Sequence, residues 1–214
     1  MKLITKNSEL EDFCQKLSLS DFITVDTEFH REKTYWPLLC LIQVAGNDDA
    51  ACIDALSEKI NLNPLYLLFK NKKITKVFHA ARQDLEIFFH LAKIIPNPIF
   101  DTQIAAMVCG FGESVSYQNI VAKLANSQID KSLRFTDWTS RPLTKKQLNY
   151  ALDDVIYLRE VYIKLKDNLT NQKRTNWVKE ELANLTDPKT YELAPNNAWK
   201  RIKSRNKKPR FLAV

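Results

Sequence analysis

Apolar and polar positions alternate along the chain with two periods, one of two residues and one of three to four. Apolar runs rich in β-branched and aromatic residues predict five strands, over residues 22–26, 39–45, 50–53, 74–78 and 99–100. Apolar residues spaced three and four apart predict helices over residues 9–17, 62–69, 81–92, 102–108, 116–124, 144–166 and 177–184. Three strands followed by alternating strands and helices indicate an α/β fold, with a mixed five-stranded sheet that carries helices on both faces.

Local signals predict where some of these elements begin. Residues 46–49 (Gly-Asn-Asp-Asp) lie between two predicted strands and indicate a hairpin. Thr144 followed by Gln147 is a capping-box pattern, which predicts the start of the longest helix. Tyr150 and Asp154 are four residues apart within that helix, so they share one of its faces. Asp101, just before another helix, is expected to cap it.

The composition narrows the class of protein. With 214 residues, 45% hydrophobic and 27% charged, the chain has the make-up of an ordinary globular protein with one main domain. We expect that domain to span residues 1–185 and a basic tail to span residues 186–214. No segment approaches the roughly 18 apolar residues of a membrane span, and none has the form of a signal peptide, so a cytoplasmic location is expected.

Glycine and cysteine usage argues against several kinds of site. Glycine occurs only at Gly46, Gly110 and Gly112, which is too few for a glycine-rich phosphate loop. The four cysteines are scattered and form no CxxC pair, which argues against a disulfide framework or a structural zinc site. A metal in this protein is therefore expected to be magnesium or manganese bound by carboxylates.

The net charge of +7 is unevenly distributed. From Arg159 onward the chain has 14 Lys and Arg against 6 Asp and Glu, whereas the first 158 residues have 18 against 19. A nearly neutral body followed by a basic segment suits a polyanionic partner such as a nucleic acid. The alternative is an ordinary solvated helix face, since charge alone does not identify the partner.

Asp26 and Glu28 at the end of a predicted strand form the first candidate site. Residues two apart on a strand point to the same face, so the two carboxylates project together. Such neighbours repel each other unless a cation lies between them, although an acidic turn at a strand end is the alternative. Asp84, in the first turn of a predicted helix, and Asp154, beside Tyr150, are further candidates. A Tyr and an Asp beside an apolar helix stripe are often only structural.

Together these sites resemble the three exonuclease motifs of the DEDD superfamily, in the branch that has Tyr in the third motif. Residues 34–43 (TYWPLLCLIQ), 100–103 (FDTQ) and 137–144 (DWTSRPLT) are in addition similar to the ribonuclease D family. The resemblance covers about residues 1–170, and its motifs occur in the expected order. It implies a ribonuclease H-like exonuclease fold, 3′–5′ hydrolysis of phosphodiester bonds from RNA 3′ ends, and two divalent ions, Mg²⁺ or Mn²⁺.

The resemblance also implies roles for the site residues. Asp26 would bridge both ions, and Glu28 and Asp154 would complete the ion on the side of the nucleophile. Asp84 would support the second ion through water. Tyr150 would orient the attacking water, because a phenol, with its ordinary pKa of about 10, is better suited to orienting water than to deprotonating it at neutral pH.

Residues near these motifs are predicted to contact the substrate: Thr27, Phe29, Tyr35, His79, Lys131, Arg134 and Arg141. The aromatic rings, with Trp36, could stack on a terminal base, and the cations could contact phosphates. The alternatives are core packing for the aromatic side chains, a structural hydrogen bond for His79 and ordinary surface charge for the Lys and Arg residues.

The expected substrate is the single-stranded 3′ end of a tRNA precursor or another structured RNA. A DNA exonuclease of the same fold is the main alternative, because the choice depends on a pocket for the 2′-hydroxyl that the sequence does not reveal. A nucleic-acid-binding module without catalysis is a second alternative, although all four acids and the Tyr are present. Residues 200–210 contain seven Lys and Arg and no acid, and the tail resembles the start of the helical domain that follows the core in ribonuclease D.

Overall fold

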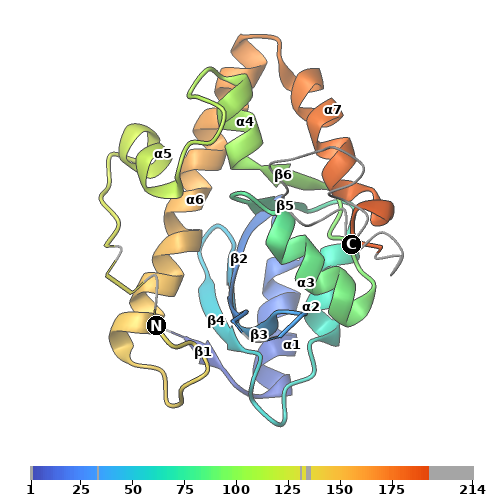
Figure 1. The fold of residues 1–214 in the computed structure, drawn as a ribbon, viewed down its shortest axis with the longest axis vertical. Coiled ribbons are helices and arrows are strands. Elements are labelled where there is room, and N and C mark those ends of the chain that lie inside the picture. Colours follow the sequence, from blue (N-terminus) through green and yellow to red (C-terminus); the bar gives the residue numbers. More distant parts are fainter. Residues whose placement is uncertain (1, 33, 131, 134–135, 193–214) are drawn as a thin grey trace, which may run out of the picture.

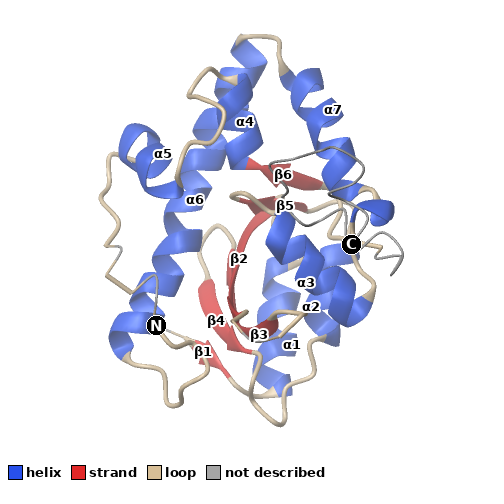
Figure 2. Cartoon of the chain, viewed as in Figure 1, coloured by secondary structure: helices blue, strands red, loops and turns tan. Residues whose placement is uncertain are grey.

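The computed structural model of this protein describes residues 2–32, 34–130, 132–133 and 136–192. Within them a six-stranded sheet lies between helices (Figures 1 and 2). Its strands are β1 (Leu3–Ile4), β2 (Phe22–His30), β3 (Leu38–Ala45), β4 (Ala50–Asp54), β5 (Thr75–Phe78) and β6 (Ile99–Asp101). They lie in the order β1-β4-β3-β2-β5-β6, which places β2 inside the sheet with a neighbour on each side.

The sheet is mixed, as predicted, because β2, β3 and β4 pair antiparallel while the other neighbours pair parallel. The predicted number of five strands is wrong, since β1 adds a sixth. With only two residues, β1 is too short to show an alternating pattern in the sequence. β2 continues to His30, beyond the predicted end at Asp26, because its pairing with β3 extends past the acidic residues with an irregularity between Glu28 and Phe29.

All seven predicted helices are present: α1 (Asn7–Leu17), α2 (Asn63–Lys70), α3 (Arg82–Ala92), α4 (Thr102–Val108), α5 (Tyr117–Leu124), α6 (Lys145–Asn171) and α7 (Thr175–Thr186). α6 begins at the predicted capping box. The Thr144 hydroxyl oxygen accepts a hydrogen bond from the Gln147 amide (3.2 Å), and Gln147 Oε1 accepts one from the Thr144 amide (2.9 Å). This cap fixes the first turns of α6, which carry Tyr150 and Asp154.

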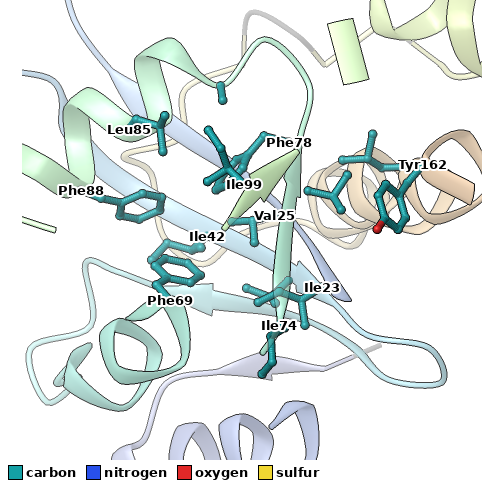
Figure 3. Close-up of a cluster of buried hydrophobic side chains, with 14 of the residues drawn as sticks. Ile23, Val25, Ile42, Phe69, Ile74, Phe78, Leu85, Phe88, Ile99 and Tyr162 are labelled. Atoms are coloured by element: carbon teal, nitrogen blue, oxygen red, sulfur yellow. The ribbon is translucent and has the colours of Figure 1, made fainter. Parts of the chain in front are cut away.

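Two apolar clusters pack against the sheet. On one face α1, α2 and α3 cover the strands, and Figure 3 shows Phe69 of α2 and Phe88 of α3 against Val25 and Ile42. Each such buried side chain stabilises the fold by about 1.5–3 kcal/mol. Long α6 crosses the opposite face (Figure 1). β2 is therefore held from both faces, which fixes the direction of its side chains.

The second, smaller cluster lies under the first part of α6 and includes Cys52 of β4 together with Ala151 and Val155 of α6. The later part of α6, from Leu158 onward, packs into the main cluster. Thr24 of β2 donates a hydrogen bond to the Val155 carbonyl at 2.8 Å, which ties the strand directly to the helix. Because side chains alternate along a strand, Asp26 and Glu28 share this face with Thr24.

The C-terminal part of the described chain packs on α3. Tyr191, after a 3₁₀ turn at Pro188–Thr190, is 4% exposed, contacts Phe89 and donates a hydrogen bond to the Leu185 carbonyl at 2.8 Å. The expected boundary between residues 185 and 186 falls at the end of α7, and most of the predicted basic tail lies outside the described residues. None of the described helices combines the length and apolar character needed to cross a membrane.

Candidate active site

Three carboxylates converge where β2 faces α6. Asp26 and Glu28 reach this point from the strand, and Asp154 reaches it from the helix, one turn after Tyr150. One carboxylate oxygen from each of the three acids lies within 4.8 Å of the other two. The three side chains are partly exposed, so the group is open to the solvent on one side.

Asp84 approaches the group from a different direction. It lies in the first turn of α3 with 6% exposure, and its carboxylate accepts a hydrogen bond from the Thr27 hydroxyl. Thr27 lies between Asp26 and Glu28 on β2 and points to the other face of the strand. Thr27 therefore holds Asp84 in place rather than facing the substrate side as predicted, and Asp84 lies beside the group of three.

The pKa values of the four acids are all raised, by burial and by the charges of acidic neighbours. Burial raises the pKa of Asp26 well above its ordinary value, and the nearby charge of Asp154 raises it further. Burial and the charges of its acidic neighbours raise the pKa of Glu28 to about 10. The pKa of Asp84 is raised first by burial and then by Asp26. For Asp154, burial and the adjacent Asp153 raise the pKa to about 7.

No counter-cation offsets this repulsion within the described chain, where no Lys, Arg or His side chain forms an ion pair with any of the four acids. Carboxylate oxygens are the preferred ligands of hard divalent cations such as Mg²⁺ and Mn²⁺. The spacing, the donor type and the missing counter-charge of Asp26, Glu28 and Asp154 therefore fit a divalent metal site.

The raised pKa values predict how metal-free stability depends on pH. Unfolded Asp and Glu titrate near pH 4, whereas folded Asp154 and Glu28 keep their protons to about pH 7 and about pH 10. Above pH 4 the unfolded chain therefore releases protons that the folded chain retains, and the free energy of unfolding falls. We expect the metal-free unfolding midpoint to decrease from pH 5 to pH 8, and Mg²⁺ to reduce that decrease because it binds the ionised acids. Thermal unfolding across this range, with and without Mg²⁺, tests this; a midpoint independent of pH would contradict it.

A cavity of about 380 Å³ opens beside the acids. Asp26, Tyr150 and Asp154 line it together with His79. Its remaining wall contains polar residues that the sequence did not single out: Gln103, Ser114, Ser116, Tyr117 and Gln118. These residues come from α4, α5 and the segment between them, so the cavity joins parts of the chain that are far apart in sequence.

Tyr117 and His79 form a fixed part of this wall. The Tyr117 hydroxyl donates a hydrogen bond to the Asp153 carbonyl at 3.0 Å. Burial and then the charges of Asp154 and Asp26 raise the pKa of Tyr117 well above its ordinary value, which keeps the phenol neutral. His79 Nδ1 lies 3.0 Å from the Thr102 hydroxyl oxygen, and its ring contacts that of Tyr117.

Asp101 caps α4, as predicted, by accepting a hydrogen bond from the Gln103 amide at 2.8 Å. The same carboxylate accepts hydrogen bonds from the amides of Ala80 (3.1 Å) and Ala81 (2.8 Å) at the start of α3. Ala80 has a φ of 59°, a conformation that costs a residue with a Cβ roughly 1–2 kcal/mol. Asp101 thus stabilises a strained turn that sets the position of Asp84.

Arg141 is fixed within the protein. Its guanidinium forms a bidentate ion pair with Asp54, with N···O distances of 2.7 and 2.8 Å. Its other N–H groups donate to the carbonyls of Cys40, Trp138 and Ser140 at 2.8–3.0 Å. All five guanidinium N–H groups are therefore used inside the protein. This gives Arg141 a structural role in place of the predicted phosphate contact.

The predicted aromatic contacts differ in their surroundings. Tyr35 is 57% exposed and has its ring edge to face with Trp36. Trp36 is stacked on His90 of α3, with 4.0 Å between ring centroids. Phe29 is partly buried and packs against the main core. Base stacking therefore stays a prediction for Tyr35, while Trp36 and Phe29 contribute to packing.

The predicted phosphate contacts Lys131 and Arg134 lie outside the described residues. His79 lines the cavity and so stays a candidate for substrate contact.

Known proteins share this sequence and this architecture. Ribonuclease D of Bartonella henselae is 56% identical over 214 residues, which are 100% of this chain and 53% of that protein. The crystal structure of Escherichia coli RNase D, described as an exoribonuclease involved in structured RNA processing, superposes with a TM-score of 0.88 at 34% identity, over 94% of this chain and 53% of that one. Brucella melitensis NrnC bound to pGG has a TM-score of 0.76 at 25% identity, over 97% and 96% of the two chains.

These relatives confirm the resemblance to ribonuclease D that the motifs indicated. The chain spans about half the length of the ribonuclease D sequences that it matches. The sequence model of the 3′-5′ exonuclease domain family matches residues 1–170, a segment that contains the three clustered acids, Asp84 and the Tyr of the third motif. The chain therefore belongs to the 3′-5′ exonuclease domain family.

Proposed function

We propose that this protein is a 3′–5′ exoribonuclease that hydrolyses phosphodiester bonds with two bound divalent ions, Mg²⁺ or Mn²⁺. The group formed by Asp26, Glu28 and Asp154 carries the proposal, because its oxygens lie within 4.8 Å of one another in partly buried surroundings. Keeping three such acids together without a cation raises their pKa values and weakens the fold at neutral pH. A divalent cation bound by these acids would remove this loss of stability and would also serve in catalysis.

Divalent ions bound to such acids activate water and neutralise charge on a phosphate. The residues of the chain hold and orient the reactants. Asp26, Glu28 and Asp154 would hold the ions with their carboxylate oxygens, and Asp84, which accepts a hydrogen bond from Thr27, would support the group from the side of that residue. Tyr150 lines the cavity with Asp26 and Asp154, and in this proposal its hydroxyl would orient the attacking water.

The choice of RNA as substrate is supported by the relatives and by the cavity wall. Relatives that are 56% and 52% identical are named ribonuclease D, and the Escherichia coli enzyme is described as involved in structured RNA processing. Gln103, Ser116 and Gln118 line the same cavity as the acids and supply neutral polar groups that can form hydrogen bonds with a ribose or a base edge. The expected substrate is the 3′ end of tRNA precursors or other structured RNA, in single-stranded form within the cavity and in the cytoplasm.

The proposal is tested with RNA and DNA oligonucleotides of identical sequence, each with a label at the 3′ or at the 5′ end. With Mg²⁺ or Mn²⁺, the 3′ label of the RNA should be released as a mononucleotide, and the 5′-labelled strand should shorten stepwise. No hydrolysis should occur in EDTA. Faster hydrolysis of DNA would favour the DNA exonuclease, and hydrolysis that persists in EDTA would exclude the metal mechanism.

We further propose that residues 1–185 form the exonuclease domain and that the basic segment 186–214 tethers long RNA through its phosphates. Removal of residues 200–214 eliminates seven Lys and Arg. We expect the KM for long RNA to rise. The slope of log KM against log salt concentration should fall by about 0.7 for each phosphate contact that is lost. Turnover of a trinucleotide should hardly change. KM values at several salt concentrations test this, and equal losses for both substrates would mean that the segment stabilises the body instead.

A further inference from the structure

Unpaired polar groups inside the described chain gather around the candidate active site. The buried side-chain nitrogen and oxygen atoms that lack a hydrogen-bond partner there belong to three residues, Gln43, His79 and Trp138. His79 lines the cavity, and the Trp138 ring lies 6.1 Å from that of Tyr150. A buried polar group without a partner costs about 1–3 kcal/mol, so each one calls for an explanation.

Of the three residues, Gln43 has the largest number of unpaired polar atoms. It lies on β3 with 0% exposure, and both atoms of its amide, Nε2 and Oε1, lack a partner among the described residues. A methionine of similar shape would fill this position without that cost. Gln43 does not line the cavity, so any use of its amide in the reaction has to pass through a neighbouring side chain.

The register of the sheet identifies that neighbour. Gln43 pairs directly with Asp26 on β2, and with Cys52 of β4 on its other side. Residues that are directly opposite point to the same face and have Cβ atoms about 4.5–5.5 Å apart. The Cys52 thiol is directed toward the Leu148 carbonyl of α6. Asp26 is therefore the charged residue to which the Gln43 amide is nearest by register.

We infer that Gln43 is a positioning residue for Asp26. In the metal-loaded protein its amide N–H donates to one Asp26 carboxylate oxygen and fixes the rotamer in which that carboxylate faces Glu28 and Asp154. Hydrogen bonds from outer residues to ligating carboxylates orient them and typically change metal affinity 10–100-fold. The inference rests on the proposed function, because it assigns Asp26 to a metal site.

The test compares Gln43→Met with a matched control, Cys52→Ala, in the full 214-residue chain. Both changes lie under α6 on adjacent strands, but Cys52 is on the far side of Gln43 from Asp26. We expect Gln43→Met to leave the metal-free unfolding midpoint unchanged or higher, because it removes an unpaired buried amide. Its Kd for Mn²⁺, measured by calorimetry, should rise 10–100-fold, whereas Cys52→Ala should bind Mn²⁺ like the parent chain.

The outcomes separate this inference from the function on which it rests. If the parent chain binds Mn²⁺ and Gln43→Met binds it within twofold of the parent, the inference is overturned and the metal site stands. If Cys52→Ala weakens binding as much as Gln43→Met does, the effect comes from packing under α6 and the inference is again overturned. If the parent chain does not bind Mn²⁺, the proposed function fails and the positioning role fails with it.

Discussion

Asp154→Asn should reduce turnover of RNA by about 10³-fold while the fold remains intact. The substitution keeps the volume of the side chain but removes one negative oxygen from the group that Asp26, Glu28 and Asp154 form. Loss of roughly 4 kcal/mol of metal-dependent transition-state stabilisation corresponds to a rate lower by about 10³-fold. Single-turnover hydrolysis of 3′-labelled RNA with Mg²⁺ measures this directly.

The same variant should not be less stable than the parent in the absence of metal. Burial and Asp153 raise the pKa of Asp154 to about 7, so the folded protein gains nothing from its charge. A neutral amide removes that charge, and the metal-free unfolding midpoint should stay the same or rise. The decrease of stability between pH 5 and pH 8 should also become shallower, because one titrating group is gone.

Asp153→Asn is the matched control for this experiment. It removes the same charge one position earlier on α6, and about 100° around the helix from Asp154. We expect its rate to stay within a few-fold of the parent rate, since Asp153 is not one of the three clustered acids. Near-normal turnover of Asp154→Asn with Mg²⁺, or equal losses for the two variants, would show that Asp154 is not a metal ligand.

The parts of the site that local rules govern could be predicted from the sequence. Alternation along β2 places Asp26 and Glu28 on one face, and the capping box at Thr144 fixes the turn of α6 that carries Asp154. Each rule involves a few neighbouring residues, so it acts whatever the rest of the fold does. The prediction that these three acids meet agrees with the spacing of their oxygens.

The parts that depend on long-range packing could not be predicted in this way. Whether Tyr117 faces the acids depends on how α5 docks on α6, and no short pattern in the sequence encodes that angle. The motif that contains Arg141 suggested a phosphate contact. In the structure its guanidinium is bound by Asp54, which is so far away in sequence that no local pattern could indicate the pairing. Gln43 belongs to an otherwise apolar strand, and nothing in that strand's sequence indicates a role for its amide. The role is indicated by the pairing of Gln43 with Asp26 on the neighbouring strand.

Tyr150→Phe should reduce the rate of RNA hydrolysis by about 10²-fold, which is less than the loss from Asp154→Asn. The change removes one hydroxyl from the cavity beside Asp26 and Asp154 and leaves every acid in place. A single side chain that orients a reactant or transfers a proton increases the reaction rate by about 10²–10⁴-fold. A side chain that only orients the water is expected at the lower end of that range. Affinity for Mn²⁺ should stay close to that of the parent, so the loss should appear in kcat.

Tyr117→Phe is the control for Tyr150→Phe. It tests whether the loss of rate comes from the water-orienting role of Tyr150 or from the loss of any phenol hydroxyl in the cavity. The Tyr117 hydroxyl donates a hydrogen bond to the Asp153 carbonyl at 3.0 Å. Its removal leaves that carbonyl with one hydrogen bond fewer and should lower the free energy of unfolding by about 1 kcal/mol, with a smaller loss of rate than Tyr150→Phe. Measurements of kcat, Mn²⁺ affinity and unfolding on both variants decide between the roles. If Tyr150→Phe loses stability and Tyr117→Phe loses rate, the water-orienting role belongs to Tyr117, whose ring lines the same cavity.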